Sequence, residues 1–373
     1  MEYKFDQIAF NSTAKKLPEE SDCQHYIGLE HLDTNSLFVS RWGSDVTPVG
    51  EKLLMKKGDV LFGKRRAYQR KVGIAPFDGI FSAHGMVLRP KENVMDKDFF
   101  PFFITSDQFM ERAVRISVGG LSPTINWKDL KEQVFEIPSL EEQKALAAKL
   151  WAAYKLREDY KRLLTATDEM VKSRFIELFG NAENTKPLSD CIGTSFPGEW
   201  GEDDPDGNGV NVIRTTNFTN SGKLDLTNVV TRKIDPAKID KKHLIPGDII
   251  LERSGGTADN PVGRVVYFDA TGTFLFNNFT QLLRCKEEVN SLFVFYSLFN
   301  YYHTHKSEIR SMGNKTTGIQ NLKMDKYWDI PIADASPEQQ EQFVCLYKQA
   351  DKSKFELKQA IEKIDKVMRS MLQ

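Results

Sequence analysis

The strongest constraint on this chain of 373 residues is an internal repeat. Short segments of the first half recur in the same order in the second half. The offset is 189 residues between GDVL at 58 and GDII at 247, and 195 between FSAHGMVLR at 81 and FNNFTQLLR at 276. It is 193 between the Ile-Pro dipeptides at 137 and 330, and 197 between DEMVKS at 168 and DKVMRS at 365. A nearly constant offset indicates a duplication with small insertions and deletions, so each half should be a globular part followed by a tail.

Both tails carry the periodicity of a long amphipathic helix. Apolar residues recur at every seventh position, and charged residues fill most of the others. This spacing predicts two helices that each bury one apolar stripe. Ser139 and Ser336, each followed by Glu or Gln, suit the N-caps of these helices, and Gly180 suits the end of the first. The stripe residues are Leu146, Ala153 and Tyr160 in the first tail and Phe343, Ala350, Leu357, Ile364 and Met371 in the second.

The length of the tails predicts how they pack. A helix over residues 141–178 would be roughly 57 Å long at ~1.5 Å per residue, which is too long to bury its stripe on one small globular part. We therefore expect the two stripes to bury each other in an antiparallel coiled pair. The alternative is that each helix packs only on its own globular part.

The globular parts are expected to be of the α+β class. β-like runs such as GDVLFG and GDIILER are mixed with aromatic helical stretches, DFFPFFITSDQFMERAV and SLFVFYSLFNYYHTHKSEI. Phe at helical spacing is expected to pack in a core rather than to stack on bases. The expected boundaries are 1–138 for the first globular part, 139–180 for the first helix, 181–335 for the second globular part and 336–373 for the second helix.

Composition excludes several classes of protein. No apolar run approaches the ~20 residues that a membrane-spanning helix needs. The first residues, Met1–Lys4, lack the basic and apolar regions of a signal peptide, so a cytoplasmic location is expected. The four cysteines form no C-x-x-C motif, which argues against a disulfide framework or a zinc ribbon. Because the net charge is −1, a surface for nucleic acid would have to be a local patch.

The sharpest local charge lies in GKRRAYQRKVG, residues 63–73. No acidic residue occurs between Asp59 and Asp78, so these cations repel one another unless an anion binds them. Arg can fork onto phosphate or onto the O6/N7 edge of guanine, which favours DNA as that anion; a solvated basic loop is the alternative. The candidate DNA-binding residues here are Lys64, Arg65, Arg66, Tyr68, Arg70 and Lys71, with Arg115 in a second acid-free interval, 112–128.

The second half carries positive loops at corresponding places, which favours two DNA footprints over scattered charge. His84 lies on a strand-like run of the first half, where it reaches either a DNA groove or the core. No metal site is expected, because His303 and His305 have no evident third ligand. The candidate DNA-binding residues of the second half are Arg253, Ser254, Arg264, Lys315 and Thr316.

The sequence shows no legible catalytic machinery. There is no G-x-x-x-x-G-K-[ST] motif for nucleotide phosphates and no Gly-rich turn with a downstream acid for a dinucleotide or S-adenosylmethionine. The Asn/Asp-Pro-Pro-aromatic run of amino-methyltransferases is also missing. These absences argue against a nucleotide-binding enzyme and against an amino-methyltransferase.

Taken together, these features resemble a known family. Two heads, each followed by a Glu-Gln phrase and a long helix, look like the specificity (S) subunit of a Type I restriction-modification enzyme. The stretch GDVLFGKRRAYQRKVGIAPFDGIFSAHGMVLRP resembles one version of that family's target recognition domain, and SPTINWKDLKEQVFEIPSLEEQ resembles its junction with the helix. The resemblance covers essentially the whole chain.

The resemblance implies two tandem target recognition domains separated by two long antiparallel helices. Each domain would read one half of a bipartite double-stranded DNA site, and the helices would set the spacer. Two methyltransferase (M) subunits would carry S-adenosylmethionine, and restriction (R) subunits would use ATP and Mg. The S subunit itself would catalyse nothing and would bind no cofactor directly. Two alternatives stay open: the specificity subunit of a Type IIB-like enzyme, and a coiled-coil scaffold that does not bind DNA.

Overall fold

The structure, a computed structural model, describes residues 1–257, 260–316 and 319–373, without the side chains of Lys315 and Thr316. The chain divides into two compact units. Unit 1 contains Met1–Leu163 and Glu356–Gln373, and unit 2 contains Leu164–Phe355. Each unit therefore combines one globular part with segments of both long helices, α5 (Leu140–Phe179) and α11 (Pro337–Met371).

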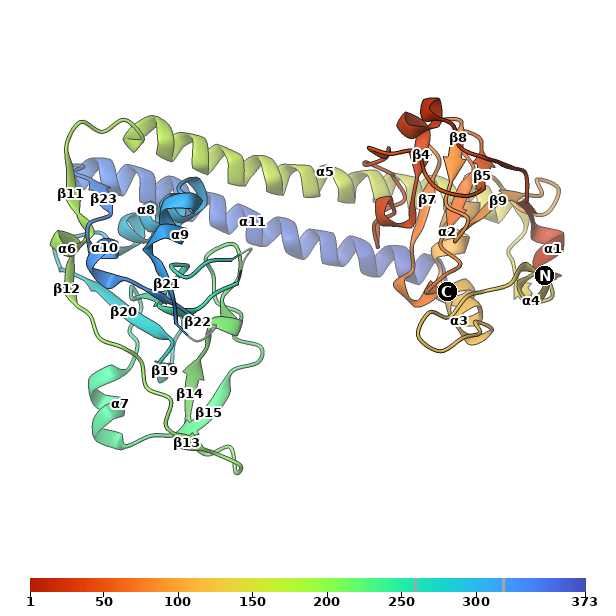
Figure 1. Ribbon diagram of the computed structural model, residues 1–373. Helices are drawn as coiled ribbons and strands as arrows, with labels where there is room; N and C mark the ends of the chain where they lie inside the picture. The colour runs from red at the N-terminus through yellow and green to blue at the C-terminus, as the bar shows by residue number, and fades with distance from the viewer. Residues whose placement is uncertain (258–259, 317–318) are drawn as a thin grey trace. The chain divides into compact units, whose positions relative to one another are not determined.

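Unit 1 contains two four-stranded sheets, in the strand orders β2-β9-β6-β7 and β3-β5-β8-β4, and a separate pair, β1-β10. Short helices surround these sheets (Figure 1). The strands are β1 (Glu2–Lys4), β2 (Ala9–Ser12), β3 (Lys15–Lys16), β4 (Tyr26–Ile27), β5 (Lys52–Met55), β6 (Val60–Phe62), β7 (Val72–Ile74), β8 (Gly79–Phe81), β9 (Met86–Pro90) and β10 (Val134–Glu136). The helices are α1 (Phe5–Ile8), α2 (Phe100–Thr105), α3 (Asp107–Arg115) and α4 (Trp127–Leu130), with short 3-10 turns η1 (Glu20–His25), η2 (Leu29–His31) and η3 (Ala67–Gln69).

Unit 2 contains sheets in the orders β12-β20-β16-β18, β13-β15-β14-β19 and β17-β22-β21, and the pair β11-β23. Its strands are β11 (Thr185–Pro187), β12 (Ile192–Thr194), β13 (Glu202–Asp203), β14 (Val210–Ile213), β15 (Val230–Lys233), β16 (Ile249–Glu252), β17 (Ser254–Gly255), β18 (Val265–Tyr267), β19 (Phe274–Phe276), β20 (Thr280–Cys285), β21 (Gly313–Thr316), β22 (Ile319–Leu322) and β23 (Pro331–Ala333). Its helices are α6 (Leu188–Cys191), α7 (Pro236–Lys242), α8 (Ser291–Thr304), α9 (Lys306–Met312) and α10 (Met324–Trp328), with the 3-10 turn η4 (Thr215–Asn217). The α+β class predicted from the sequence is confirmed in both units.

The repeated GD segments have the same structural role in both units. Asp59 accepts hydrogen bonds from Arg89 on β9, at 2.5 and 2.7 Å, and Asp248 accepts two from Arg284 on β20, both at 2.7 Å. These hydrogen bonds raise the pKa of both arginines. The matched ion pairs tie one end of the central hairpin to the neighbouring strand, so these repeated residues are structural.

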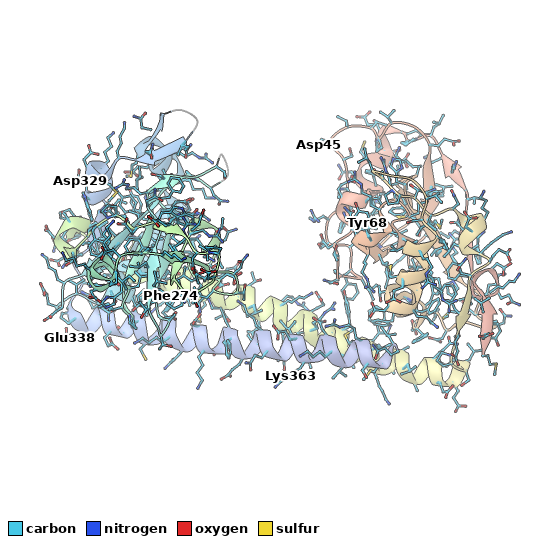
Figure 2. All side chains as sticks on the ribbon, turned by 90° about the horizontal axis from the view of Figure 1, so that it is seen from below. Asp45, Tyr68, Phe274, Asp329, Glu338 and Lys363 are labelled. Carbon is cyan, nitrogen blue, oxygen red and sulfur yellow. The ribbon has the colours of Figure 1, made fainter. Side chains whose placement is uncertain are left out.

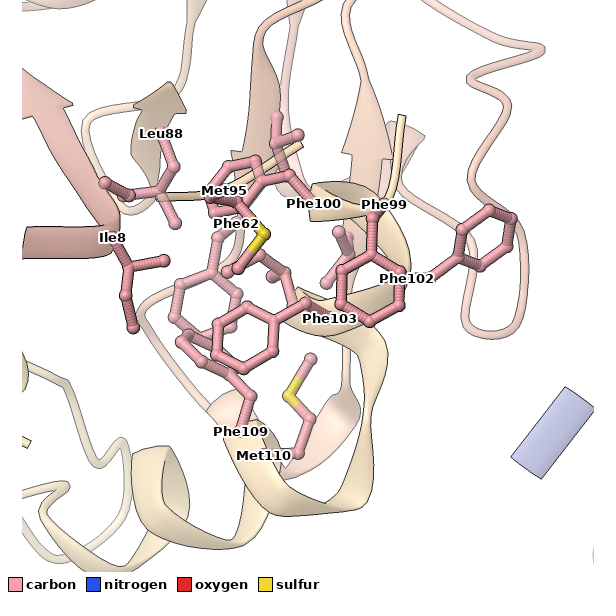
Figure 3. Packing of buried hydrophobic residues seen from close by; sticks show 14 of the residues in the cluster. Ile8, Phe62, Leu88, Met95, Phe99, Phe100, Phe102, Phe103, Phe109 and Met110 are labelled. Atoms are coloured by element: carbon pink, nitrogen blue, oxygen red, sulfur yellow. The ribbon is translucent and has the colours of Figure 1, made fainter. Parts of the chain in front are cut away.

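The aromatic stretches are core elements, as predicted. In unit 1 the rings of Phe5, Phe103, Phe109 and Phe135 pack edge-on, tilted or stacked, with centroids 5.3 to 5.8 Å apart. Figure 3 shows part of this cluster, in which side chains of α2 and α3 pack against residues of the sheet. In unit 2 helix α8 contributes the buried residues Leu292, Phe293, Val294, Phe295, Tyr296, Ser297, Leu298, Tyr301 and Tyr302.

The two predicted long helices are confirmed, and each begins at the predicted cap. The Ser139 amide donates to Glu142 Oε2 at 2.9 Å, and the Ser336 amide donates to Gln339 Oε1 at 3.0 Å. The serine hydroxyls accept in return from the amides of Glu142 and Gln339, at 3.4 and 3.3 Å. Both starts are therefore capping boxes. No helix in the described part of the chain is both long and apolar enough to cross a membrane.

Within each unit, α5 and α11 pack together antiparallel (Figure 1). In unit 1, Arg157 donates to Asp365 at 3.1 Å, and Met368 of α11 is buried in the same cluster as Leu150 and Tyr154 of α5. In unit 2, Asp168 accepts from Lys354 at 2.5 Å, and the ring of Phe175 lies 5.0 Å from that of Phe343. Residue numbers rise along one helix while they fall along the other, as the predicted antiparallel pair requires.

The repeat of the Ile-Pro dipeptide was interpreted wrongly as a match of equivalent positions. Strand β10 pairs Phe135 with Tyr3, whereas β23 pairs Ile332 with Lys186, at the same place in each two-stranded sheet. The offset at this strand is 197, from 332 minus 135, and the capping serines share it. Pro331 is therefore the counterpart of Val134 rather than of Pro138. Ile137-Pro138 follows β10, whereas Pro331 is the first residue of β23, so the two dipeptides occupy different positions in the repeat.

Candidate nucleic-acid interface

The basic segment of unit 1 connects strands β6 and β7, and its backbone is held from both sides. Gly63 donates to Lys71 O at 2.9 Å across the hairpin, Arg65 donates to His84 O at 3.2 Å, and Ile125 donates to Lys64 O at 3.0 Å. Arg66 and Arg70 lie on either side of η3 with φ of 56° and 52°, in the left-handed region that favours glycine. A side chain other than Gly at such a position costs on the order of 1–2 kcal/mol, so a functional reason for these arginines is expected.

Arg65 and Arg66 converge on one hydroxyl group. Each donates from Nε to Ser122 Oγ at 3.0 Å, although Ser122 lies more than fifty residues away in the sequence. Arg65 Nη1 also lies 3.5 Å from His84 Nε2. Both arginines are exposed, and neither forms an ion pair with a described acidic residue. We call Arg65, Arg66, His84 and Ser122 the arginine cluster.

Further positive charge surrounds the arginine cluster. Burial lowers the pKa of His84 below its ordinary value of 6.5, and the charges of Arg65, Lys64 and Lys52 lower it further. Burial, followed by the charge of Lys15, also lowers the pKa of Lys64. The charges of Arg65, Lys64 and Lys52 thus disfavour protonation of His84, and the charge of Lys15 disfavours protonation of Lys64. An anion placed at this surface would relieve that repulsion, which is the electrostatic condition for a phosphate or a guanine edge.

The structure separates Arg70 and Lys71 from the arginine cluster. Arg70 donates to Asp107 Oδ1 and to Thr105 O, and it lines a cavity of about 520 Å³ beside α3. Lys71 is partly buried and donates from Nζ to Leu29 O at 2.7 Å. Both side chains therefore have structural partners, and their predicted contact with DNA stays a prediction.

Tyr68 and Arg115 are both exposed. Tyr68, labelled in Figure 2, lies on η3 and is 55% exposed. Its side chain forms no hydrogen bond with a described residue. Arg115 is the last residue of α3. Tyr68 is available for contact with a partner, whereas the exposure of Arg115 alone does not connect it to the arginine cluster.

Unit 2 repeats the backbone of this surface with different side chains. Leu322 donates to Arg253 O at 2.8 Å, as Ile125 does to Lys64 O, and Ser254 donates to Phe279 O at 2.9 Å, as Arg65 does to His84 O. The counterparts of Lys64, Arg65, Arg66 and His84 are therefore Arg253, Ser254, Gly255 and Phe279. The left-handed position of Arg66 is filled here by Gly255, with φ of 116°.

The candidate side chains of unit 2 are more fully engaged than those of unit 1. Arg253 Nη1 donates to Gln281 Oε1 at 3.3 Å, and the Ser254 hydroxyl donates to Asn321 Oδ1 at 2.6 Å. Arg264 donates to the buried Glu252 at 2.6 Å and lies over the ring of Phe218. The charge of Arg264 is therefore neutralised within the fold. The predicted contact of Arg264 with DNA stays a prediction.

The remaining candidates of unit 2 can be placed only by their backbone. Lys315 and Thr316 are paired with Gln320 and Ile319 in the β21-β22 hairpin. Their side chains lie outside what the structure describes. Among the described residues, no group of three or more His, Cys, Asp or Glu side chains gathers as a metal site.

Sequence reasoning missed several residues of these two surfaces. Ser122 belongs to the arginine cluster, Lys15 and Lys52 lie near it, and Phe279 and Asn321 occupy the matching surface of unit 2. None stands out in its own segment, because a Ser or Asn gains its role only from a partner distant in the sequence. Alignment of the two halves could have found Phe279, since it falls opposite His84 at the offset of 195 that the repeat itself gives.

Comparison with known proteins gives one family and one fold. The family described as Type I restriction modification DNA specificity domain matches residues 15–162 and 194–366. A solved chain from work on the complex assembly and conformational transition of the type I R-M system is 16% identical, with a TM-score of 0.57 over 100% of this chain and 96% of that chain. The S subunit of a Type I restriction-modification system from M. genitalium is 13% identical, with a TM-score of 0.54 over 100% of this chain and 96% of that one. No curated protein matches the sequence. At these identities, the structural likeness shows a shared fold.

Proposed function

This chain belongs to the family of Type I restriction modification DNA specificity domains, and from that premise we propose that it reads a bipartite double-stranded DNA site. Each unit binds one half-site. The chain itself is the non-catalytic specificity subunit of the enzyme. Sequence recognition of this kind combines phosphate contacts, which position the protein, with contacts to base edges, which specify the sequence.

One observation carries this proposal: the two units present different side chains from the same backbone framework. Arg65 and His84 of unit 1 stand where unit 2 has Ser254 and Phe279, while the backbone hydrogen bonds around them are conserved. A framework that is kept while the side chains on it change is expected of a domain that reads different sequences. A coiled-coil scaffold without a DNA-binding role gives no reason for this pattern.

The exposed cations provide the affinity that does not depend on sequence. Arg66 is exposed and held by Ser122, and Lys64 lies beside it, so both can approach phosphates at the edge of a groove. Each neutralised phosphate releases counterions, and binding should therefore weaken steeply as salt rises. With a net charge of −1, the chain depends on these local patches for its attraction to DNA.

The helix pair is the part of the chain that would set the spacing and bind the enzyme subunits. Leu156 and Leu163 on α5 are 44% and 50% exposed, which suits contact with a protein partner. We assign this surface to methyltransferase (M) subunits, two per complex, which carry S-adenosylmethionine. Restriction (R) subunits supply the ATP- and Mg-dependent steps. A complex of this kind acts on DNA in the cytoplasm, and the paired helices fix the number of unread base pairs between the half-sites.

Methylation by the assembled complex tests the proposal. The chain is co-expressed with its M partner, and methylated positions in exposed DNA are mapped by long-read sequencing. A single motif of two short specified halves separated by a gap of fixed length is the expected result. Ungapped methylation, or none that depends on this chain, would refute the bipartite reader.

A paired variant locates the surface. Replacement of Arg65 and Arg66 with Ala should abolish specific binding and methylation while the complex with M still assembles. The charge-matched control is Lys97→Ala with Lys131→Ala, which removes two cations of unit 1 outside the arginine cluster and should leave methylation nearly unchanged. Equal losses in both variants would show that total charge, rather than this surface, governs binding.

Mapping the cleavage positions of the complete enzyme, together with methylation by the Arg65 and Arg66 variant, separates the two alternatives. A Type IIB-like enzyme would also methylate a gapped site, but its nuclease would be fused to the methyltransferase and would cut at fixed positions near the site. A scaffold that does not bind DNA would give complexes whose methylation is indifferent to the Arg65 and Arg66 substitutions.

A further inference from the structure

We propose that Arg65 reads a guanine in the half-site bound by unit 1, and that no residue of unit 2 makes the equivalent contact from the matching position. This inference rests on the proposed function, because it specifies how one half of the site is read. It follows from the way in which the Arg65 side chain and backbone are held.

The guanidinium group of Arg65 is oriented before any DNA binds. Its Nε donates to Ser122 Oγ at 3.0 Å, and its Nη1 lies 3.5 Å from His84 Nε2. These two neighbours lie on different edges of the planar group, so together they restrict its rotation. No described acidic residue pairs with it, which leaves the outer N–H groups of the fork for a ligand.

The backbone of Arg65 is equally restricted. Its amide donates to His84 O at 3.2 Å, and Arg65 forms an isolated antiparallel bridge with Thr124. The flanking residue Lys64 accepts from the Ile125 amide at 3.0 Å. A side chain that projects from a backbone fixed on two sides loses little conformational entropy on binding, which is a requirement for an accurate contact.

A fixed guanidinium plane favours a base edge over a phosphate. Guanine presents two acceptors, O6 and N7, side by side in the major groove, and Arg can donate to both at once. Adenine and cytosine each present a donor in that groove, which would oppose an N–H of Arg, and thymine offers a single acceptor. Phosphate accepts from many directions and does not need an oriented plane.

Arg66 differs from Arg65 in a way that assigns it to the phosphate. It shares Ser122 but has no second side-chain hydrogen bond to a described residue, so its plane is held by a hydrogen bond at one point only. Leu121, which precedes the shared Ser122, is 98% exposed. The two adjacent arginines therefore provide a matched pair with the same charge and different expected roles.

Unit 2 cannot make this contact at the same place. Ser254 replaces Arg65, and its hydroxyl is already bound to Asn321 at 2.6 Å. Phe279, 42% exposed, replaces His84. The half-site read by unit 2 should therefore lack the Arg-guanine contact, and it serves as an internal control in every experiment on Arg65.

The first experiment compares Arg65→Ala and Arg66→Ala in complex with the M partner on a library of DNA sites. Arg65→Ala should lose about 10- to 100-fold discrimination at one G·C pair of one half-site, as expected for a bidentate contact. Arg66→Ala should weaken binding to all sequences alike and should lower the salt slope by about one. An unchanged preference in the other half-site shows that the complex is folded.

The second experiment removes the acceptor instead of the donor. The guanine identified in the first experiment is replaced by 7-deazaguanine, which lacks N7. The wild-type complex should lose affinity, and Arg65→Ala should be indifferent to the replacement. Ser122→Ala, which keeps the arginine and frees its plane, should lose part of the discrimination at the same base pair.

The outcomes separate this inference from the function on which it rests. If Arg65→Ala weakens all sequences equally, or if 7-deazaguanine affects wild type and variant by the same factor, Arg65 contacts phosphate and the inference is wrong while the bipartite reader stands. If the wild-type complex shows no sequence preference in either half-site, both fail.

Discussion

The two units of this chain are similar in backbone and different in the surfaces that they expose. In both units, the segment that follows the central strand, β6 or β16, is held by the same backbone hydrogen bonds. In both, an Asp–Arg ion pair joins the start of that strand to the neighbouring strand, β9 or β20. At matching positions, unit 1 exposes Arg65 and Arg66, which have no ion-pair partner among the described residues, whereas unit 2 has the buried Ser254 and Gly255. The duplication has thus kept the framework, where one lost hydrogen bond would be costly, and has changed the side chains that it carries.

The helix pair shows a second difference between the units. In unit 1 the Tyr154 hydroxyl accepts from the Leu37 amide at 2.7 Å, so a loop of the globular part is bound directly to α5. At the matching position of unit 2, α11 has Asp351, which is paired with Lys223. A buried hydrogen bond has been exchanged for a partly exposed ion pair. In unit 2 the helix pair also packs through the aromatic group of Phe175, Tyr296 and Phe343.

The largest predicted effect tests that aromatic group. Phe343→Ala should lower the free energy of unfolding of unit 2 by about 3–5 kcal/mol, because a fully buried ring is lost. Its counterpart Leu146 is only partly buried, so Leu146→Ala should cost unit 1 about 1–2 kcal/mol. Urea unfolding followed by hydrogen exchange in each unit measures both. Equal costs would mean that the two ends of the helix pair are packed alike.

The next effect concerns the ion pairs between α5 and α11. Arg157 is 8% exposed and has three partners, namely Glu158, Asp365 and Asn35 O, so Arg157→Ala should cost about 2–3 kcal/mol. Lys354 is paired with Asp168, which is 64% exposed, and Lys354→Ala should cost under about 1 kcal/mol. The loss of stability of each variant is measured by thermal unfolding at low and at high salt. A larger loss for Lys354→Ala would contradict the comparison.

A matched effect is predicted where the units agree. Asp59→Asn and Asp248→Asn should each cost about 1.5–3 kcal/mol, because each removes the charge from a pair of charge-assisted hydrogen bonds to an arginine. The two values should lie within about 0.5 kcal/mol of each other, a limit typical of the error of additive comparisons. Chemical denaturation of the single and double variants measures them. A large difference would show that the framework has diverged too.

The smallest effect is a pH dependence limited to unit 1. In the folded chain, burial and the charges of Arg65, Lys64 and Lys52 lower the pKa of His84 below its ordinary value of 6.5. As pH falls below 6.5, the unfolded chain therefore binds more protons at His84 than the folded chain does. The contribution of His84 to stability is therefore complete above pH 6.5 and is lost as pH falls through the lowered value. His84→Phe, the residue found in unit 2, should reduce the loss of thermal stability of unit 1 between pH 7.5 and 5.5. No change relative to wild type would show that other groups set the pH response.

Several features could be predicted because they depend on neighbours along the chain. The heptad spacing of the apolar stripes predicted the two long helices, since a period of 3.5 residues is a local property of the sequence. The capping serines predicted where these helices begin for the same reason. The helical spacing of Phe103, Phe109 and Phe293 predicted that these side chains are buried. The repeat gave the division into two similar halves, although the Ile-Pro dipeptides misled the alignment at the edge strand.

The DNA-binding surface was predicted only in part, because the charge of a side chain does not show whether it forms an ion pair or hydrogen bond within the fold. Five cations of one segment, residues 63–73, contribute to the positive charge of unit 1, yet Arg70 is bound by Asp107 and Lys71 by Leu29 O. Arg264 looked equivalent to them and is neutralised by Glu252. Sequence distance hides such pairs, and no local pattern distinguishes a paired arginine from an unpaired one.

By itself, the sequence determined the α+β class, the duplication, the two helices and the segment in which positive charge is concentrated. Periodicity, capping and composition are local quantities, so one chain suffices to infer them. The tertiary structure alone decided that Arg65 and Arg66 share Ser122, that His84 faces them, and that the matching surface of unit 2 carries Ser254 and Phe279. Those relations are made by folding, which brings a loop, a strand end and a second loop together over more than fifty residues of sequence.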